Sequence, residues 1–264
     1  MIINDDNTLR QYLPNALVTV EGEKTLFDKM RMELRLSEKW AKRFLVGEEQ
    51  FGLVDAEDLG KLIAEDAFMR AIPSLDLVLT PNGFGVVSNN TIAPASKERV
   101  ERLIANLERA RDYTIEDILH TLLAETDWRT TAQGRYFTQT LFQTPRTLPV
   151  SLHKDHALAY FEQVHPQLVL IETELAEKYI SLPVYDSLRS DTDNPSYTHI
   201  VSVLRSIETD LLTGQPLPYK PLVTLVEHIR SHADIFPEWQ TSKTAELYKS
   251  HYFENAKTAS GYWW

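Results

Sequence analysis

The stretch that most constrains the fold is Pro73 to Ser96, with the sequence PSLDLVLTPNGFGVVSNNTIAPAS. Leucines occupy alternate positions 75, 77 and 79, the period-2 pattern of a strand with one buried face. Thr80-Pro-Asn-Gly83 supplies turn chemistry, because proline presets φ and asparagine and glycine tolerate positive φ. Phe84 to Ser88 (FGVVS) then continues in residues that favour strands. The stretch predicts a β-hairpin over 75–88.

The rest of the chain has helical periodicity, with apolar residues three and four positions apart. A helix is expected over 25–45, closed by Gly47 in the usual C-terminal glycine position. The next helix starts at Asp55 and is expected to end at Pro73. Beyond the hairpin, Ser96 is placed to cap a helix. Residues 114–124 start with a cap residue of their own, so we expect there a separate helix or a kinked continuation of the first. Further helices are expected over 153–164, 166–181, 196–213 and 219–232.

The predicted fold class is mainly α, a helical bundle with one β-hairpin inserted between helices. Residues 1–125 form a helical domain that carries the hairpin. Residues 126–150 mix aromatic residues with Thr, Gln, Gly and two prolines, so we expect an irregular crossover there. Residues 151–264 form a second helical subdomain with an aromatic tail, or pack with the first half as one domain. The string Leu36-Ser-Glu-Lys-Trp40 resembles Leu175-Ala-Glu-Lys-Tyr179. Either a duplicated helical unit or chance explains this similarity.

Composition excludes several classes of protein. The 264 residues include no cysteine, so disulfides, thiolate chemistry and cysteine-ligated metals are ruled out. A formal net charge of −11 argues against a surface that attracts nucleic-acid phosphates, and no sequence-specific nucleic-acid partner is expected. The N-terminus MIINDDNTLRQYL lacks the basic and apolar regions of a signal peptide. No run approaches the roughly 18 apolar residues that span a bilayer, so we expect a soluble protein with no membrane partner.

Two histidine pairs are the candidates for metal chemistry. His228 and His232 are four apart on an expected helix, and His153 and His156 are three apart. Neither pair forms the HExxH pattern, so ordinary partly exposed histidines are the simpler interpretation. The arginines after the hairpin alternate with glutamates and are interpreted as a solvated face. These are Arg99, Arg102, Arg109 and Arg111. No catalytic residue, metal or cofactor is predicted.

A resemblance to a known family is carried by four strings of the sequence. They are AIPSLDLVLTPNGFGVVSNNTIAPASKERVERL, WRTTAQGRYFTQTLF, LAEKYISLPVYDSL and the GYWW ending. The strings resemble an uncharacterised family encoded in phages and prophages of gut Bacteroidales bacteria, whose genes tend to lie among virion morphogenesis genes. In outline, the first half is similar to the head–tail connector (adaptor, or head-completion) proteins of tailed phages. The second half departs from the compact adaptor, which leaves the exact role open.

The resemblance implies a non-enzymatic virion assembly protein, most specifically a head–tail connector that forms a ring of identical subunits. Its partners would be further copies of itself and portal or tail proteins. It would be made in the bacterial cytoplasm and end in the virion. The residues expected to carry contacts are Leu77, Leu79, Phe84 and Val86 of the hairpin and Tyr262, Trp263 and Trp264 of the tail.

Two other function classes fit the same residues. One is a binding module that is absent from finished particles, such as a tail-assembly chaperone or a cytoplasmic regulatory adaptor. The other is a metal-dependent hydrolase that uses the histidines at 153, 156, 228 or 232.

Overall fold

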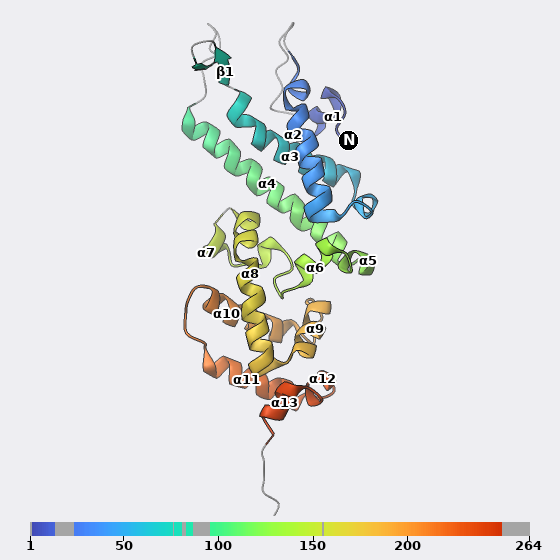
Figure 1. Cartoon of the computed structure of the whole chain (residues 1–264), viewed down its shortest axis with the longest axis vertical. Helices are drawn as coiled ribbons and strands as arrows, with labels where there is room; N and C mark the ends of the chain where they lie inside the picture. Colours follow the sequence, from blue (N-terminus) through green and yellow to red (C-terminus); the bar gives the residue numbers. More distant parts are fainter. Residues whose placement is uncertain are drawn as a thin grey trace, which may run out of the picture. The chain divides into compact units, whose positions relative to one another are not determined.

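The computed structural model describes residues 2–13, 24–75, 77–80, 83–86, 96–154 and 156–249, and these residues are mainly helical. Figure 1 shows the helices in chain order. Contacts divide the chain into two units, Met1–Pro166 and Gln167–Trp264, so the division falls at Pro166. The segment 126–150, expected as the crossover between domains, therefore lies inside the first unit.

The first unit is built on three long helices that lie side by side in the order α2, α3, α4 (Figure 1). Their bounds are Leu26–Trp40 for α2, Ala56–Leu75 for α3 and Lys97–Leu123 for α4. Helix α3 is buried around most of its circumference because α2 and α4 cover it on two sides. The short helix α1 (Asp6–Tyr12) adds Leu9 to the apolar core that α2 and α3 share.

Local capping explains where the first helices begin. The side chain of Asp5 accepts a hydrogen bond from the backbone N–H of Thr8, 2.7 Å away, at the start of α1. Thr25 does the same for the N–H of Asp28 at the start of α2, at 3.2 Å. Each cap satisfies one backbone donor that the first helical turn leaves without a partner.

The end of α3 corrects the prediction that Pro73 terminates this helix. The helix includes Pro73 and continues to Leu75, so Leu75 is helical and is not the first residue of a strand. Leu75 packs against the apolar core of the first unit, which includes Ile72. This packing favours two more helical residues after Pro73. The proline removes one backbone hydrogen-bond donor, and it does so in the last turn of the helix.

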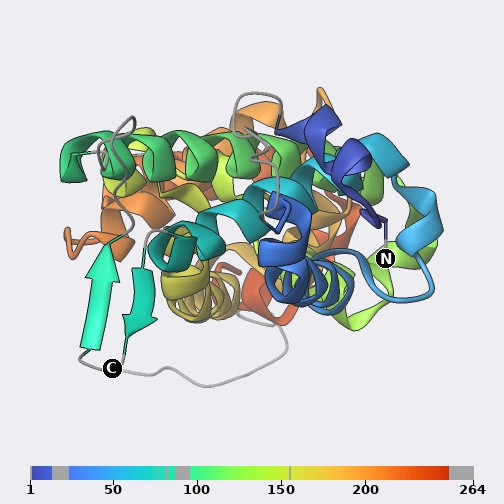
Figure 2. The same cartoon turned by 90° about the horizontal axis from the view of Figure 1, so that it is seen from above.

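Two strands of four residues follow α3, β1 (Leu77–Thr80) and β2 (Gly83–Val86). The two strands run antiparallel (Figure 2). In their register, Leu77 is opposite Val86 and Leu79 is opposite Phe84. Among the described residues, each strand pairs only with the other. Residues 87 and 88, the end of the expected second strand, lie outside the described residues.

Helix α4 corrects the expectation of a break at Thr114, because it runs without interruption from Lys97 to Leu123. The hydroxyl of Thr114 donates to the carbonyl of Ala110 at 3.2 Å and lies 3.4 Å from a carboxylate oxygen of Glu65. Thr114 therefore binds back to its own helix and across to α3, and it does not cap a new helix.

Residues 126–150 are more ordered than the expected irregular crossover. They contain α5 (Thr126–Arg129), α6 (Ala132–Thr138), the 3₁₀ turn η3 (Pro145–Thr147) and the first residue of α7 (Val150–His153). These elements are too short to show a helical stripe in the sequence. Their aromatic side chains hold them in place: Trp128 and Phe137 are fully buried, and the indole N–H of Trp128 donates to the carbonyl of Val46 at 2.9 Å.

Helix α8 (Ala157–Leu175) corrects the expectation of separate helices over 153–164 and 166–181, because it continues through Pro166. Buried Leu158 and Phe161 precede the proline and buried Leu168 follows it at helical spacing, so one apolar stripe spans the interruption. Pro166 itself is exposed. The loss of one backbone hydrogen bond at the proline is thus outweighed by packing on both sides.

The second unit consists of helices from the later part of α8 onward. They are α9 (Leu182–Ser190), α10 (Thr198–Leu212), α11 (Tyr219–Ser231), α12 (Pro237–Gln240) and α13 (Lys243–Leu247). Helices α10 and α11 pack on each other, and α12 packs on α9. In the part of the chain that the structure describes, no helix combines the length and the apolar character needed to cross a membrane.

A similar helix end occurs once in each unit. Helix α2 passes into the π-helix η1 (Ala41–Val46) and α8 into the π-helix η4 (Ala176–Ile180). The N–H of the next residue, Gly47 or Ser181, donates to the carbonyl five residues back. Gly47 has φ 95° and ψ 149°, and Ser181 has φ 85° and ψ 142°. The predicted role of Gly47 in closing the first long helix is confirmed.

The close approach of α6 to α5 gives a test of the packing. A Cβ atom on Gly134 would overlap the backbone carbonyl of Trp128 and lie 2.7 Å from the Cα of Arg129. Gly134→Ala should therefore lower the free energy of unfolding by about 1–3 kcal/mol, although alanine is normally the better helix former. Chemical denaturation measures the loss.

The matched control is Gly52→Ala in the 3₁₀ turn η2 (Phe51–Leu53), where an added Cβ meets no atom within 4 Å. That variant should stay within about 0.5 kcal/mol of the parent. Equal effects of the two substitutions would contradict the packing of α6 on α5.

Candidate functional site

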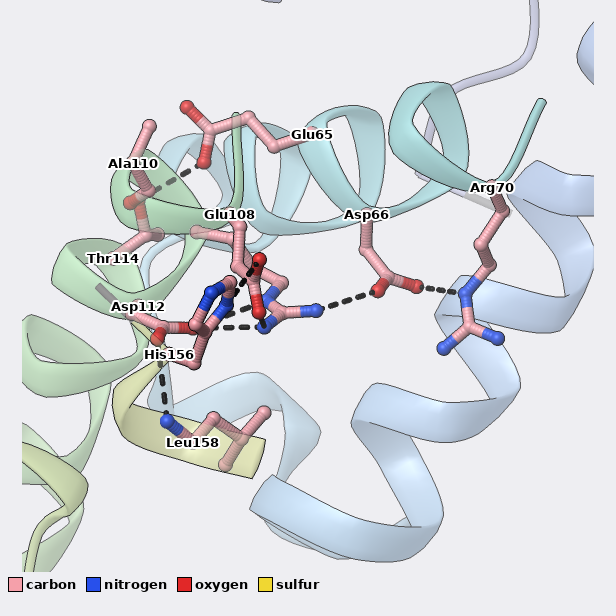
Figure 3. A network of polar contacts seen from close by, with 10 residues as sticks. Glu65, Asp66, Arg70, Glu108, Ala110, Asp112, Thr114, His156 and Leu158 are labelled. Carbon is pink, nitrogen blue, oxygen red and sulfur yellow. Dashed lines mark hydrogen bonds and ion pairs between the residues drawn. The ribbon is translucent and has the colours of Figure 1, made fainter. Parts of the chain in front are cut away.

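A buried guanidinium, that of Arg111, lies at the centre of a polar network in the first unit. Figure 3 shows the surrounding residues, among them Asp66 and Asp112. Arg111 is only 7% exposed. Its Nε and Nη2 donate to Oδ1 of Asp112 at 3.2 and 2.9 Å, and its Nη1 lies 3.5 Å from Oδ1 of Asp66 on α3. One side chain of α4 therefore pairs with a carboxylate on its own helix and with one on the neighbouring helix.

Asp66 extends the network from α3 to α2. Its Oδ2 accepts a hydrogen bond from the hydroxyl of Ser37 at 2.6 Å and another from Nε of Arg70 at 2.7 Å. Asp66 and Ser37 are both fully buried. A buried carboxylate is stable only when it is paired and hydrogen-bonded, and Asp66 meets both conditions through groups from three helices.

Asp112 connects the network to the start of α8. Its Oδ2 accepts the backbone N–H of Leu158 at 3.2 Å, in the first turn of that helix (Figure 3). Burial raises the pKa of Asp112, and the adjacent Arg111 opposes this effect. Nearby, Glu108 of α4 contacts His156 at 2.9 Å on the exposed side of the network.

Glu65, one residue before Asp66, faces a different environment. It is buried, and its hydrogen-bonding neighbour is the neutral hydroxyl of Thr114. Burial raises the pKa of Glu65 to about 7, although Lys61, Thr114 and Arg111 act in the opposite direction. Asp66 directly contacts the guanidinium groups of Arg70 and Arg111, whereas the hydrogen-bonding neighbour of Glu65 is a neutral hydroxyl.

The sequence prediction that Arg111 belongs to a solvated face is wrong. The buried residues of α4 include Ile115, Ile118 and Leu122. The same stripe, followed backwards at three- and four-residue spacing, passes through position 111 and then Leu107. A charged residue at a position where the helical repeat places apolar residues indicates a buried ion pair. The neighbouring glutamates and arginines made position 111 resemble part of an exposed charged face.

The two histidine pairs fall in different units. His153 ends α7 and is 8% exposed, and His156 contacts Glu108. His228 and His232 stack with ring centroids 4.1 Å apart, and Nδ1 of His232 donates to the carbonyl of His228 at 2.8 Å. Across the described ranges, no group of three or more His, Cys, Asp or Glu side chains is arranged to hold a metal ion.

The residues predicted to carry contacts fall into two groups. Leu77, Leu79, Phe84 and Val86 form two directly opposed pairs on β1 and β2, at alternate positions of the ladder. Tyr262, Trp263 and Trp264 lie outside the described residues.

Comparison with protein families shows a similarity in the first unit. Residues 23–138 are similar to a family of unknown function (DUF6712). The matched range contains α2, α3, both strands and α4, and with them the Ser37, Asp66 and Arg111 contacts. Searches of curated proteins and of solved structures returned no match.

The Arg111 network predicts a large loss of stability when its central cation is removed. Arg111→Met should lower the free energy of unfolding by about 3–5 kcal/mol, because the substitution leaves buried carboxylates without a compensating charge. Urea denaturation followed by circular dichroism measures the loss.

Arg70→Met is the matched control, since Arg70 contacts the same carboxylate of Asp66 but its side chain is 46% exposed. A loss below about 1 kcal/mol is expected for this control. Equal losses for the two variants would contradict a central role for Arg111.

The raised pKa of Glu65 predicts a pH-dependent stability. Between its ordinary value of 4.5 and about 7, the folded protein holds a proton that the unfolded chain releases. Stability from this group is therefore lost as pH rises through that window. Relative to the parent, Glu65→Gln should gain about 2.5 kcal/mol in the free energy of unfolding between pH 5 and pH 8.

Denaturation of both proteins at the two pH values measures this change. Asp117→Asn, at an exposed position of α4, should show no such change relative to the parent. A Glu65→Gln difference that stays constant with pH would mean that Glu65 titrates normally in the folded protein.

Proposed function

We propose that the chain is a non-enzymatic assembly protein of a tailed phage, specifically a head–tail connector subunit that forms a ring with other copies of itself. The observation that carries the proposal is the strand pair β1–β2, a short hairpin inserted between the long helices α3 and α4. The resemblance of the sequence to a phage-encoded family supplies the biological setting.

The hairpin suits contact between subunits because each strand has a free edge. Among the described residues, β1 and β2 form a sheet of only two strands, so the outer edge of each has no ladder partner. An unpaired edge is a template for a strand from another chain. The pairs Leu77–Val86 and Leu79–Phe84 would add apolar contacts to those backbone hydrogen bonds.

The helices on either side give the hairpin a fixed base. Helix α3 is held between α2 and α4, and the Arg111 network ties α2, α3 and α4 together through buried contacts. A contact segment that is already held by rigid helices loses less conformational freedom on binding than a segment on a flexible loop.

The charge of the chain agrees with a ring through which DNA passes. A formal net charge of −11 would reduce attraction between the ring and DNA phosphates, so the DNA would not be held in transit. The portal above and tail proteins below would be the neighbouring partners. The protein would be made in the bacterial cytoplasm and remain in the particle.

Quantitative mass spectrometry of purified particles from an induced host tests this role. A connector should be present at a fixed low copy number, about a dozen per particle if it follows the rotational symmetry of the portal. Protein that is abundant in the lysate and absent from particles would overturn the connector proposal. That result would favour an assembly chaperone or a regulatory adaptor.

Polar substitutions in the hairpin test the contact surface itself. Phe84→Ser with Val86→Ser should reduce incorporation into particles at least about tenfold while the helical circular dichroism is unchanged. The control is Val78→Ser, which alters the other face of the same strand pair. A loss of helical signal in the double variant would assign the hairpin to the core and would contradict the proposed contact surface.

A further inference from the structure

A pocket of about 110 Å³ lies in the first unit between α4, η3 and the α7 segment. The polar and aromatic side chains of its wall are those of Arg109, Asp112, Tyr113, Arg146, His153 and Lys154. One water molecule requires roughly 10–15 Å³ of such space, so the pocket has room for a larger polar group.

The wall of the pocket is positively charged although the protein is acidic. Three cations, Arg109, Arg146 and Lys154, face a single carboxylate, that of Asp112. Both oxygens of Asp112 are already engaged, one by Arg111 and the other by the N–H of Leu158. These two contacts come from outside the pocket, and the side chains of Arg146 and Lys154 bring two positive charges to its wall.

Arg146 is held flat by an aromatic ring. Its guanidinium carbon lies 3.6 Å from the centre of the Tyr113 ring. Stacking fixes the plane of a guanidinium and leaves the N–H groups at its edge available for an anion. Within the described part of the chain, neither Arg146 nor Lys154 forms an ion pair with a carboxylate.

Lys154 has a backbone conformation that agrees with a functional position. Its φ is 52°, a region that residues other than glycine seldom occupy. It follows α7 directly, so the strained residue is next to His153 in the wall of the pocket. Strain of this kind persists where the surrounding structure requires a side chain in one place.

We propose that this pocket binds a phosphate group, either free phosphate or the terminal phosphate of a small molecule. Arg146 would bind two of its oxygens through the guanidinium edge, and Lys154 and Arg109 would add positive charge. A polyanion such as nucleic acid is a poorer candidate, because the pocket admits one such group and the chain as a whole repels it. The site is independent of the proposed role in assembly.

Isothermal titration of the full chain with inorganic phosphate at low ionic strength tests the site. Saturable binding with a dissociation constant of about 1 mM or tighter is expected. Arg146→Gln and Lys154→Gln should each weaken binding about tenfold. The controls Arg99→Gln and Lys220→Gln remove the same charges at exposed positions outside the pocket and should leave binding unchanged.

Two results would overturn the proposal. One is the absence of saturable binding, and the other is an equal loss in the pocket and control variants, which would indicate attraction by overall charge alone. A parallel titration with a nucleoside monophosphate identifies the source of the group. Tighter binding than inorganic phosphate would assign a larger phosphorylated ligand, and equal or weaker binding would assign free phosphate.

Discussion

The fold of the first unit depends on the pairing of Arg111 with Asp66 and Asp112. Each of these charges would be unstable alone in the interior, and each becomes tolerable because the others are present. The contacts reach Ser37 on α2 and the backbone of Leu158 on α8, so one guanidinium sets how four helices meet. Apolar packing alone allows helices to slide past one another, whereas directed polar contacts between buried groups select one arrangement.

Much of the helical architecture follows from local sequence, and its exceptions have specific causes. The apolar spacing of the first long helix and Gly47 at its end are visible in the chain. Pro73 was predicted to end a helix and Pro166 to separate two, yet each lies inside one helix. Each proline removes one backbone hydrogen-bond donor, and the burial of apolar side chains beyond it, Leu75 and Leu168, favours continuing the helix. Thr114 resembles a cap by type alone, and its partners Ala110 and Glu65 become evident only in three dimensions.

The candidate sites differ in how far the sequence reveals them. The β1–β2 pair is local, since its alternation and its turn lie within one stretch. The phosphate pocket is not local: Arg109 and Lys154 are far apart in the chain, and they meet because Trp128 and Phe137 fold the intervening segment onto the first unit. No periodic pattern marks such a segment, because its elements are only four to seven residues long. Sites of this kind need tertiary structure to be recognised.

The π-helical ends at Gly47 and Ser181 share a backbone conformation but permit different residues. The similar strings LSEKW and LAEKY end seven residues before Gly47 and two residues before Ser181. Because the strings occupy different positions relative to the two helix ends, chance explains their similarity better than duplication. At position 47 the positive φ is the main constraint, which favours glycine. At position 181 the side-chain oxygen also accepts the N–H of Val184. Over evolutionary time, position 181 can therefore exchange serine for asparagine or aspartate, which also cap a helix. Far fewer substitutions of Gly47 would leave stability unchanged.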